Sequence, residues 1–160
     1  MIKVTFKDEE GVPCKVVKRY NQGEATTVTL KGKMKYPDYW LMIPKDIWKW
    51  VSNHPIIDND SPWSIHIRVQ GKARRSPKDE DNPQLAERIA EARAKIKLYR
   101  FLYILSNKVC TYLESLLVGP HTKGIYRYTS SNEGIMADRA KYKRLWNAEA
   151  THLKKLLKSS

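Results

Sequence analysis

The chain has 160 residues, of which 41% are hydrophobic; this is enough apolar material for one ordinary core and excludes a disordered chain. Lysine and arginine number 30 against 17 acidic residues, and the resulting formal net charge of +13 favours polyanionic partners. No apolar run reaches ~18 residues, so we expect a soluble, cytoplasmic protein without a membrane partner.

The first 70 residues predict a small antiparallel sheet with one short helix. Residues 2–6 and 63–69 alternate apolar with polar side chains, a pattern typical of half-buried strands. A short helix is expected from Pro44 to about Asn53, and turn-forming residues predict a loop at 58–62. β-Branched and apolar stretches predict the remaining strands at 12–20, 26–31 and 39–43.

One long helix is the strongest structural signal in the sequence. Asp81 or Asn82 can cap it, Pro83 suits its first turn, and Gly119-Pro120 ends it. Its apolar residues recur at alternating steps of four and three along one seam, and from Leu98 onward they cover most sides. We expect the second half to be enclosed by the fold, but the seam is also long enough to form a homodimer with a second copy.

A last helix is predicted from about Gly134 to Leu157, after a short strand or loop at 124–129. Its apolar residues share one arc and its basic residues the opposite arc, with Glu149 as a charge inside the apolar arc. Strands first and helices second predict a single α+β domain. We expect a small antiparallel sheet or partly closed barrel over 1–70, a charged connector over 71–82 and a helical half over 83–160.

Basic side chains in the helical half are the main candidate binding residues. Spaced cations neutralise phosphates and release counterions without reading a base sequence, so they are suited to DNA or RNA. The alternative is a solvated helix face with no binding role. The predicted phosphate ligands are Lys72, Arg74 and Arg75 in the connector, Arg93, Lys97 and Arg100 on the long helix, and Lys143, Arg144, Lys154, Lys155 and Lys158 on the last helix.

Aromatic residues in the β-rich half are a second candidate, because exposed aromatic rings between cations can stack single-stranded bases. Core packing is the favoured interpretation for most of them. Trp48 is the one we expect to be exposed, since it lies off the apolar side of its short helix.

Two aspartates, Asp58 and Asp60, precede a strand that ends in Gln70-Gly71-Lys72. The order resembles in outline a metal-dependent nuclease, in which paired carboxylates hold a divalent ion and a lysine assists attack on phosphate. Gln70 stands where that pattern has an acid, and turn formation explains the two aspartates more simply. Neither cysteines nor histidines are spaced for zinc, so we predict no metal, no cofactor and no catalytic residue.

The stretch at 76–94 contains Ser76-Pro77-Lys78-Asp79 followed by Ile89-Ala90 and Ala92-Arg93-Ala94. It resembles a strand-to-helix signature of small phage-encoded proteins, although alanine replaces their glycine at position 92. The resemblance implies a phage or mobile-element origin and assigns no catalytic role. Independently, small residues at Ala86, Ala90 and Ala94 allow another backbone to approach closely, either the sheet or a phosphate chain.

Three functions are consistent with these features. The first is a non-enzymatic nucleic-acid-binding protein that contacts phosphates through basic helix faces. The second is a phage-type inhibitor or adaptor that binds a host protein, such as a defence nuclease, and an exposed apolar patch at Trp48 and Trp50 would favour it. The third is a metal-dependent nuclease.

Overall fold

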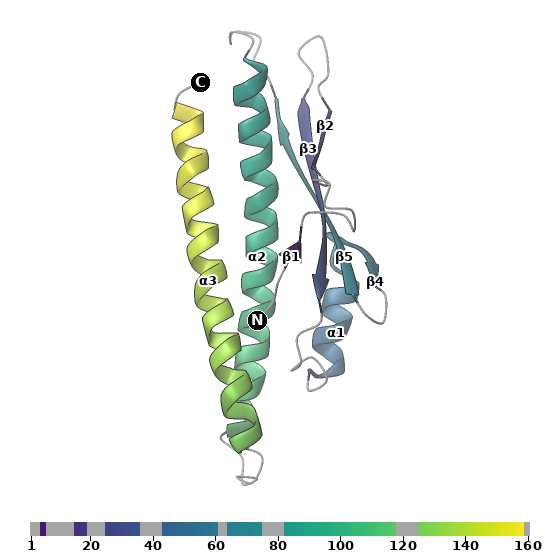
Figure 1. The fold of residues 1–160 in the computed structure, drawn as a ribbon, viewed down its shortest axis with the longest axis vertical. Coiled ribbons are helices and arrows are strands. Elements are labelled where there is room, and N and C mark those ends of the chain that lie inside the picture. The colour runs from purple at the N-terminus through teal and green to yellow at the C-terminus, as the bar shows by residue number, and fades with distance from the viewer. Residues whose placement is uncertain are drawn as a thin grey trace.

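A computed structural model describes residues 4–5, 15–18, 25–35, 43–60, 64–74, 82–117 and 125–158. Within them the chain is α+β, with strands first and two long helices last, as predicted (Figure 1). No described helix combines the length and apolarity that a bilayer span requires. The elements are β1 (Val4–Thr5), β2 (Lys15–Lys18), β3 (Thr26–Lys35), α1 (Lys45–Ser52), β4 (Ile57–Asp60), β5 (Ser64–Ala73), α2 (Pro83–Leu117) and α3 (Ile125–Lys158).

The sheet is antiparallel and open, which corrects the alternative of a partly closed barrel. Its order is β1-β3-β5-β4, and β2 also pairs with β3. The two ten-residue strands β3 and β5 pair along their whole length, from Thr26↔Ala73 to Lys35↔Ser64. This long central pair of strands carries the face on which α2 packs.

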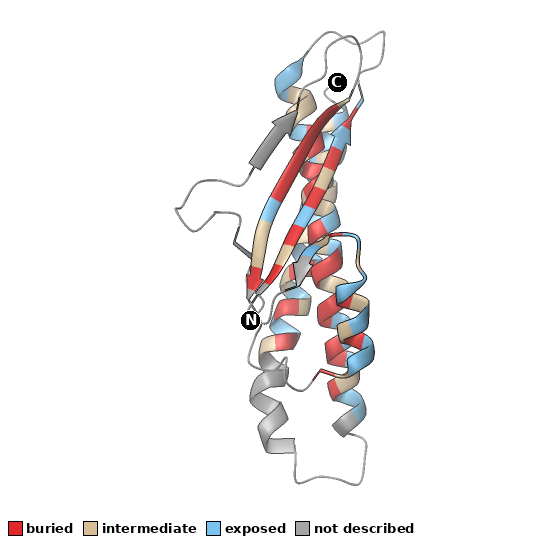
Figure 2. Ribbon diagram, turned by 90° about the vertical axis from the view of Figure 1, so that its right-hand side faces the viewer, coloured by how far each residue is buried: buried red, intermediate tan, exposed pale blue. Residues whose placement is uncertain are grey.

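The molecule has three layers, with α2 between the sheet and α3 (Figure 1). Burial alternates along β5, because one face of the sheet packs on α2 and the other does not (Figure 2). In β3 the residues from Thr26 to Leu30 are all buried, on both faces of the sheet. The second half of α2 is enclosed on its apolar sides, where Leu98, Phe101 and Leu105 are buried, whereas Asn107 and Lys108 on the remaining side are exposed. The seam of α2 packs on α3 of the same chain, so a second copy would have to displace α3 to use it.

Four boundaries differ from the sequence predictions. β3 runs to Lys35, past the predicted end at 31, because its last residues pair with the start of β5. β5 continues through Gly71 to Ala73, where the sequence predicts a connector. The strand can continue because its inward positions, Val69, Gly71 and Ala73, are small enough to be buried. β4 occupies part of the predicted loop at 58–62, because pairing with β5 overrides the local turn preference of its aspartates. α3 begins at Ile125, so the predicted strand or loop at 124–129 is helical over its described residues, 125–129.

The start of α2 is as the sequence predicts. The side-chain oxygen of Asn82 accepts a hydrogen bond from the amide of Leu85 at 3.0 Å, and Pro83 is the first helical residue. The cap satisfies one of the amides that a helix start leaves without a partner. It fixes where the helix begins and therefore which residues of α2 cross the sheet.

Gly71 is where α2 and β5 approach most closely. A Cβ at this position would overlap the carbonyl oxygen of Ala90 and lie 2.6 Å from the amide nitrogen of Ala94. Ala90 and Ala94 are themselves fully buried. The small-residue stripe therefore serves tight packing against the sheet, and its use by an approaching phosphate is ruled out.

We expect Gly71→Ala to destabilise the protein by about 3 kcal/mol or more, since the added methyl group meets helix backbone that cannot rotate away. Chemical denaturation measures the effect. Gly134→Ala is the matched control: a Cβ there meets nothing within 4 Å, and replacing a helical glycine should stabilise by about 0.5–1 kcal/mol. Equal effects of the two substitutions would contradict the close crossing.

Candidate nucleic-acid interface

The outward face of α3 carries the densest group of exposed cations in the described residues. Lys143, Arg144, Lys154, Lys155 and Lys158 are all exposed. In a helix these positions fall on one side, and at about 1.5 Å per residue they extend over roughly 22 Å. We call these five residues and the exposed residues between them the outer face of α3.

The acidic residues of α3 that the structure describes lie away from this outer face. Asp138 is fully buried toward α2, and Glu149 lies 4.0 Å from Lys95 of α2. The ion pair explains the charge that the sequence places inside the apolar arc. None of the five outer-face cations forms an ion pair with a described carboxylate, so their charge is not compensated locally.

One outer-face residue has an aromatic neighbour. The Lys143 ammonium lies 6.0 Å from the ring centre of Tyr103, and that ring packs against Trp146 at 5.8 Å. The contact orients the side chain without neutralising its charge, since cation–π attraction uses the face of a neutral ring. Leu157, predicted to lie in the apolar arc, is 44% exposed because it is one residue off the line of Tyr142, Glu149 and Leu156.

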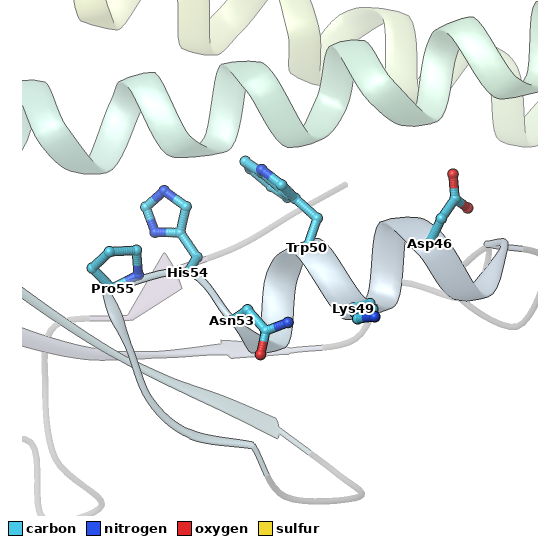
Figure 3. A pocket seen from close by; sticks show the side chains of 6 residues that line it. All are labelled: Asp46, Lys49, Trp50, Asn53, His54 and Pro55. Carbon is cyan, nitrogen blue, oxygen red and sulfur yellow. The ribbon is translucent and has the colours of Figure 1, made fainter.

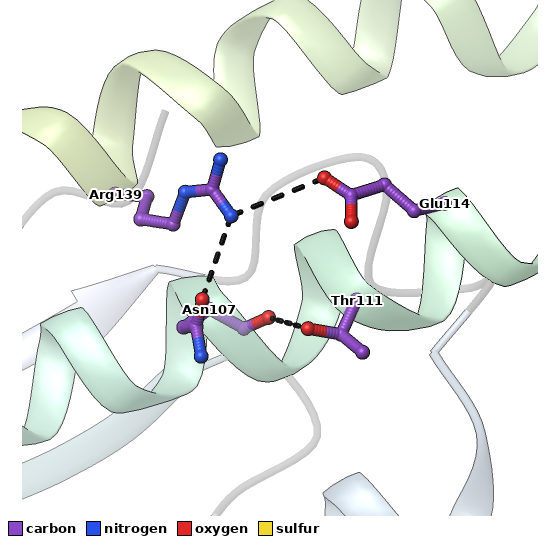
Figure 4. A network of polar contacts seen from close by, with 4 residues as sticks. All are labelled: Asn107, Thr111, Glu114 and Arg139. Carbon is purple, nitrogen blue, oxygen red and sulfur yellow. Dashed lines mark hydrogen bonds and ion pairs between the residues drawn. The ribbon is translucent and has the colours of Figure 1, made fainter.

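A polar network holds α3 in place against the second half of α2. Arg139 donates to the side-chain oxygen of Asn107 at 3.4 Å and lies 4.0 Å from a carboxylate oxygen of Glu114 (Figure 4). Thr111 donates to the backbone oxygen of Asn107 at 2.9 Å. Together with the Lys95–Glu149 pair, these contacts use charges at the joint between the helices and leave the outer face to the remaining cations.

Two predicted phosphate ligands on α2 are instead bound to the sheet. Arg93 donates to the backbone oxygen of Lys72 at 2.6 Å, and Lys97 donates to the backbone oxygen of Gln70 at 2.8 Å. These carbonyls lie on either side of Gly71, where the helix crosses closest. Both cations therefore have a structural role that the sequence prediction missed.

Arg93 and Lys97 bind these carbonyls because this part of β5 is an edge of the sheet. The amide of Arg68 donates to Ile56, so Arg68 faces the β4 side of β5, and by the period of two the backbones of Gln70 and Lys72 face the same way. The described pairing with β4 ends at Ile57↔Ile67, so this part of β5 is an edge. Charged side chains that cover an edge satisfy its carbonyls and oppose pairing with another chain.

Replacing both Arg93 and Lys97 by Gln should lower the free energy of unfolding by about 1–2 kcal/mol. This is less than two buried charged hydrogen bonds would contribute, because both side chains are partly solvated. Urea denaturation measures it. Arg100→Gln is the matched control and should change stability by less than about 0.5 kcal/mol, because exposed Arg100 has no hydrogen bond or ion pair within the described chain. A larger effect at Arg100 would contradict the assignment.

The predicted binding residues thus divide into groups. The five of the outer face of α3 share one side of one helix, whereas Arg93 and Lys97 cap the edge of β5. Lys72 and Arg74 are both exposed; Lys72 lies within β5 and not in a connector, and Arg74 directly follows the strand. Arg75 lies outside the described residues.

Trp50 belongs to an aromatic cluster between α1 and α2. Its ring stacks on Phe101 at 5.3 Å with an interplanar angle of 10°, His54 packs against both rings, and the Lys108 ammonium lies 5.2 Å from the indole centre. Trp48, expected to be exposed, is half-buried and packs against the core. The apolar patch that would favour a host-protein partner is therefore not found at these two tryptophans.

A shallow pocket of about 420 Å³ lies beside this cluster (Figure 3). Trp50 and His54 point from α1 and its following turn toward α2, and Asp46, Lys49 and Asn53 complete the lining. Burial lowers the pKa of His54. Its Nδ1 accepts a hydrogen bond from the amide of Ile56 at 3.3 Å, which requires that nitrogen to be unprotonated.

Stability should therefore fall as the pH drops below about 6.5. The unfolded chain protonates His54 near that pH while the folded chain resists, so the stabilisation is fully present above 6.5 and is lost through the window below it. We expect the difference in melting temperature between pH 7.5 and pH 5.5 to be smaller in His54→Gln than in the wild type. An unchanged difference would contradict the role of this imidazole.

The interface between α2 and α3 contains a small group of buried polar side chains. Ser106, Cys110 and Asp138 are buried there, and the hydroxyl of Ser106 donates to the backbone oxygen of Leu102 at 2.8 Å. Burial, with the nearby charge of Asp138, raises the pKa of Tyr142 well above its usual range. Burial likewise raises the pKa of the Cys110 thiol, which makes it a poor nucleophile. These groups pack the two helices together.

The residues of the nuclease-like pattern have structural roles where they are described. The side-chain amide of Gln70 donates to Thr29 at 3.2 Å, and its backbone oxygen binds Lys97. Asp58 is exposed on β4. No group of three or more metal-ligating side chains occurs within the described ranges.

No protein-family model, curated protein or solved structure matches this chain. The phage or mobile-element origin implied by residues 76–94 therefore stays a prediction. Function has to be inferred from the surface itself.

Proposed function

We propose that this is a non-enzymatic nucleic-acid-binding protein that contacts phosphates through the outer face of α3. The observation that carries the proposal is the separation of charges on the helical half. The carboxylates of Glu149 and Glu114 lie at the joint with Lys95 and Arg139, while the outer face presents five cations without an acidic side chain among them. Such a surface attracts a phosphate backbone and gains from counterion release.

Cations elsewhere have a smaller part in this proposal. Arg93 and Lys97 already donate to backbone oxygens, so binding phosphate would cost those hydrogen bonds. Their charge still adds to the electrostatic potential that steers a polyanion toward the helices. Arg100, exposed and without such partners, can contact phosphate directly from α2.

We expect affinity for nucleic acid to fall steeply with salt. Replacing Lys143, Arg144, Lys154 and Lys155 by Gln should reduce the slope of log K against log salt by about 3–4, since each phosphate contact contributes roughly 0.7–0.9. Fluorescence anisotropy over a salt series measures the slope.

The matched control removes four exposed cations from the sheet and α1: Lys31, Lys45, Lys49 and Arg68 replaced by Gln. It has the same net charge as the α3 variant. We expect its slope to stay within about one contact of the wild type. Equal losses in the two variants would mean that total charge and not the outer face of α3 governs binding, and an absence of binding at low salt would refute the proposal.

A further inference from the structure

The outer face of α3 has two clusters of cations with an uncharged segment between them. Lys143 and Arg144 form one cluster, and Lys154 and Lys155 form the other. The second cluster lies eleven positions after the first, which is about 16 Å along the helix axis. The exposed residues between the clusters are Asn147, Ala148, Thr151 and His152, and by helical spacing the short Asn147 and Thr151 lie in the middle of the face, whereas His152 lies at its margin.

The arrangement of these side chains around the helix fits a B-form major groove. The groove is about 12 Å wide, and a helix with its side chains is about 10–12 Å across, so a helix enters with its axis along the groove. By helical spacing, Lys143 and Lys154 then lie on one side of the outer face and Arg144 and Lys155 on the other, each row toward one phosphate wall, while Asn147 and Thr151 lie between the rows, over the base edges. Long or charged side chains in the middle would hold the helix out of the groove.

We propose that the ligand is double-stranded DNA and that α3 seats its outer face in the major groove. This inference rests on the proposed function and names the class of nucleic acid. The row of Lys143 and Lys154 and the row of Arg144 and Lys155 contact phosphates of opposite strands, while Asn147 and Thr151 meet base edges. Asn147 has no side-chain hydrogen bond within the described chain, and Thr151 donates to the backbone oxygen of Asn147 at 3.0 Å and keeps its methyl group for apolar contact.

The layered fold gives α3 the access that this docking needs. α3 is the outermost layer and packs on α2, on the side opposite the outer face (Figure 1). Asn147, Ala148 and Thr151 are all exposed, so no other described element covers the segment between the clusters. A rigid helix packed along one side only can enter a groove without rearrangement of the sheet.

Other nucleic acids fit this surface less well. Single strands are bound by stacking bases on aromatic rings, and the large apolar side chains exposed within the described residues are Met136 and Leu157, neither of them aromatic. A-form duplex RNA has a deep, narrow major groove that a helix cannot enter. Duplex DNA is the form that accepts an exposed helix of this length and charge.

The test compares three probes of one sequence at a single salt concentration: a duplex DNA of about 20 base pairs, the matching duplex RNA and the single DNA strand. The full chain should bind duplex DNA about tenfold or more tightly than the other two. Asn147→Leu combined with Thr151→Leu, which leaves the charge unchanged, should weaken duplex binding about tenfold. Ala137→Leu, exposed on the same helix but outside the clusters, is the matched control and should bind as the wild type does.

Three outcomes decide the matter, with circular dichroism confirming that each variant is folded. Preference for duplex DNA that is lost in the double leucine variant supports groove docking. Salt-dependent binding with equal affinity for all three probes, or an unaffected double variant, overturns groove docking and leaves phosphate binding in place. An absence of salt-dependent binding to any probe overturns the proposed function itself.

Discussion

The structure depends on the approach of two backbones at Gly71. Because this residue has no side chain, α2 can lie against β5 with Ala90 and Ala94 in direct contact with the strand. The approach brings Arg93 and Lys97 within reach of the carbonyls on either side of Gly71. It also fixes the rotation of α2 about its axis, so that the remaining apolar seam points away from the sheet and has to be covered by α3.

Cations of the helical half therefore have two different roles, and their distance from a backbone acceptor decides which. A guanidinium or ammonium beside an open strand edge satisfies carbonyls that would otherwise depend on water or on another chain. Once engaged, it gives little direct binding to a ligand. On α3 no strand edge is near, because α2 lies between α3 and the sheet, and so Lys154 and Lys155 stay exposed to solvent.

The sequence predicted what depends on local periodicity and failed where distant partners decide. The seam of α2 and its Asn82 cap both follow from helical spacing and composition. Helical spacing also places Arg93 and Lys97 on one arc, but it cannot say that a strand edge faces that arc, since the register between α2 and β5 is set by Gly71. The turn-like aspartates of β4 were misread for the same reason: pairing with β5 outweighs local preference.

The outer face of α3 carries like charges that no ion pair within the described residues offsets. Lys154 and Lys158 are four residues apart on one side of the helix, and like charges at that spacing repel, although the dipole of α3 favours cations such as Lys158 in its last turn. The same chain places acidic residues against Lys95 and Arg139 at the helix joint, so compensation occurs where α2 meets α3. Repulsion between like charges that no contact in the protein compensates is typical of sites that bind another molecule. A polyanion bound along the outer face would supply the missing counter-charge, and binding should then stabilise α3 itself.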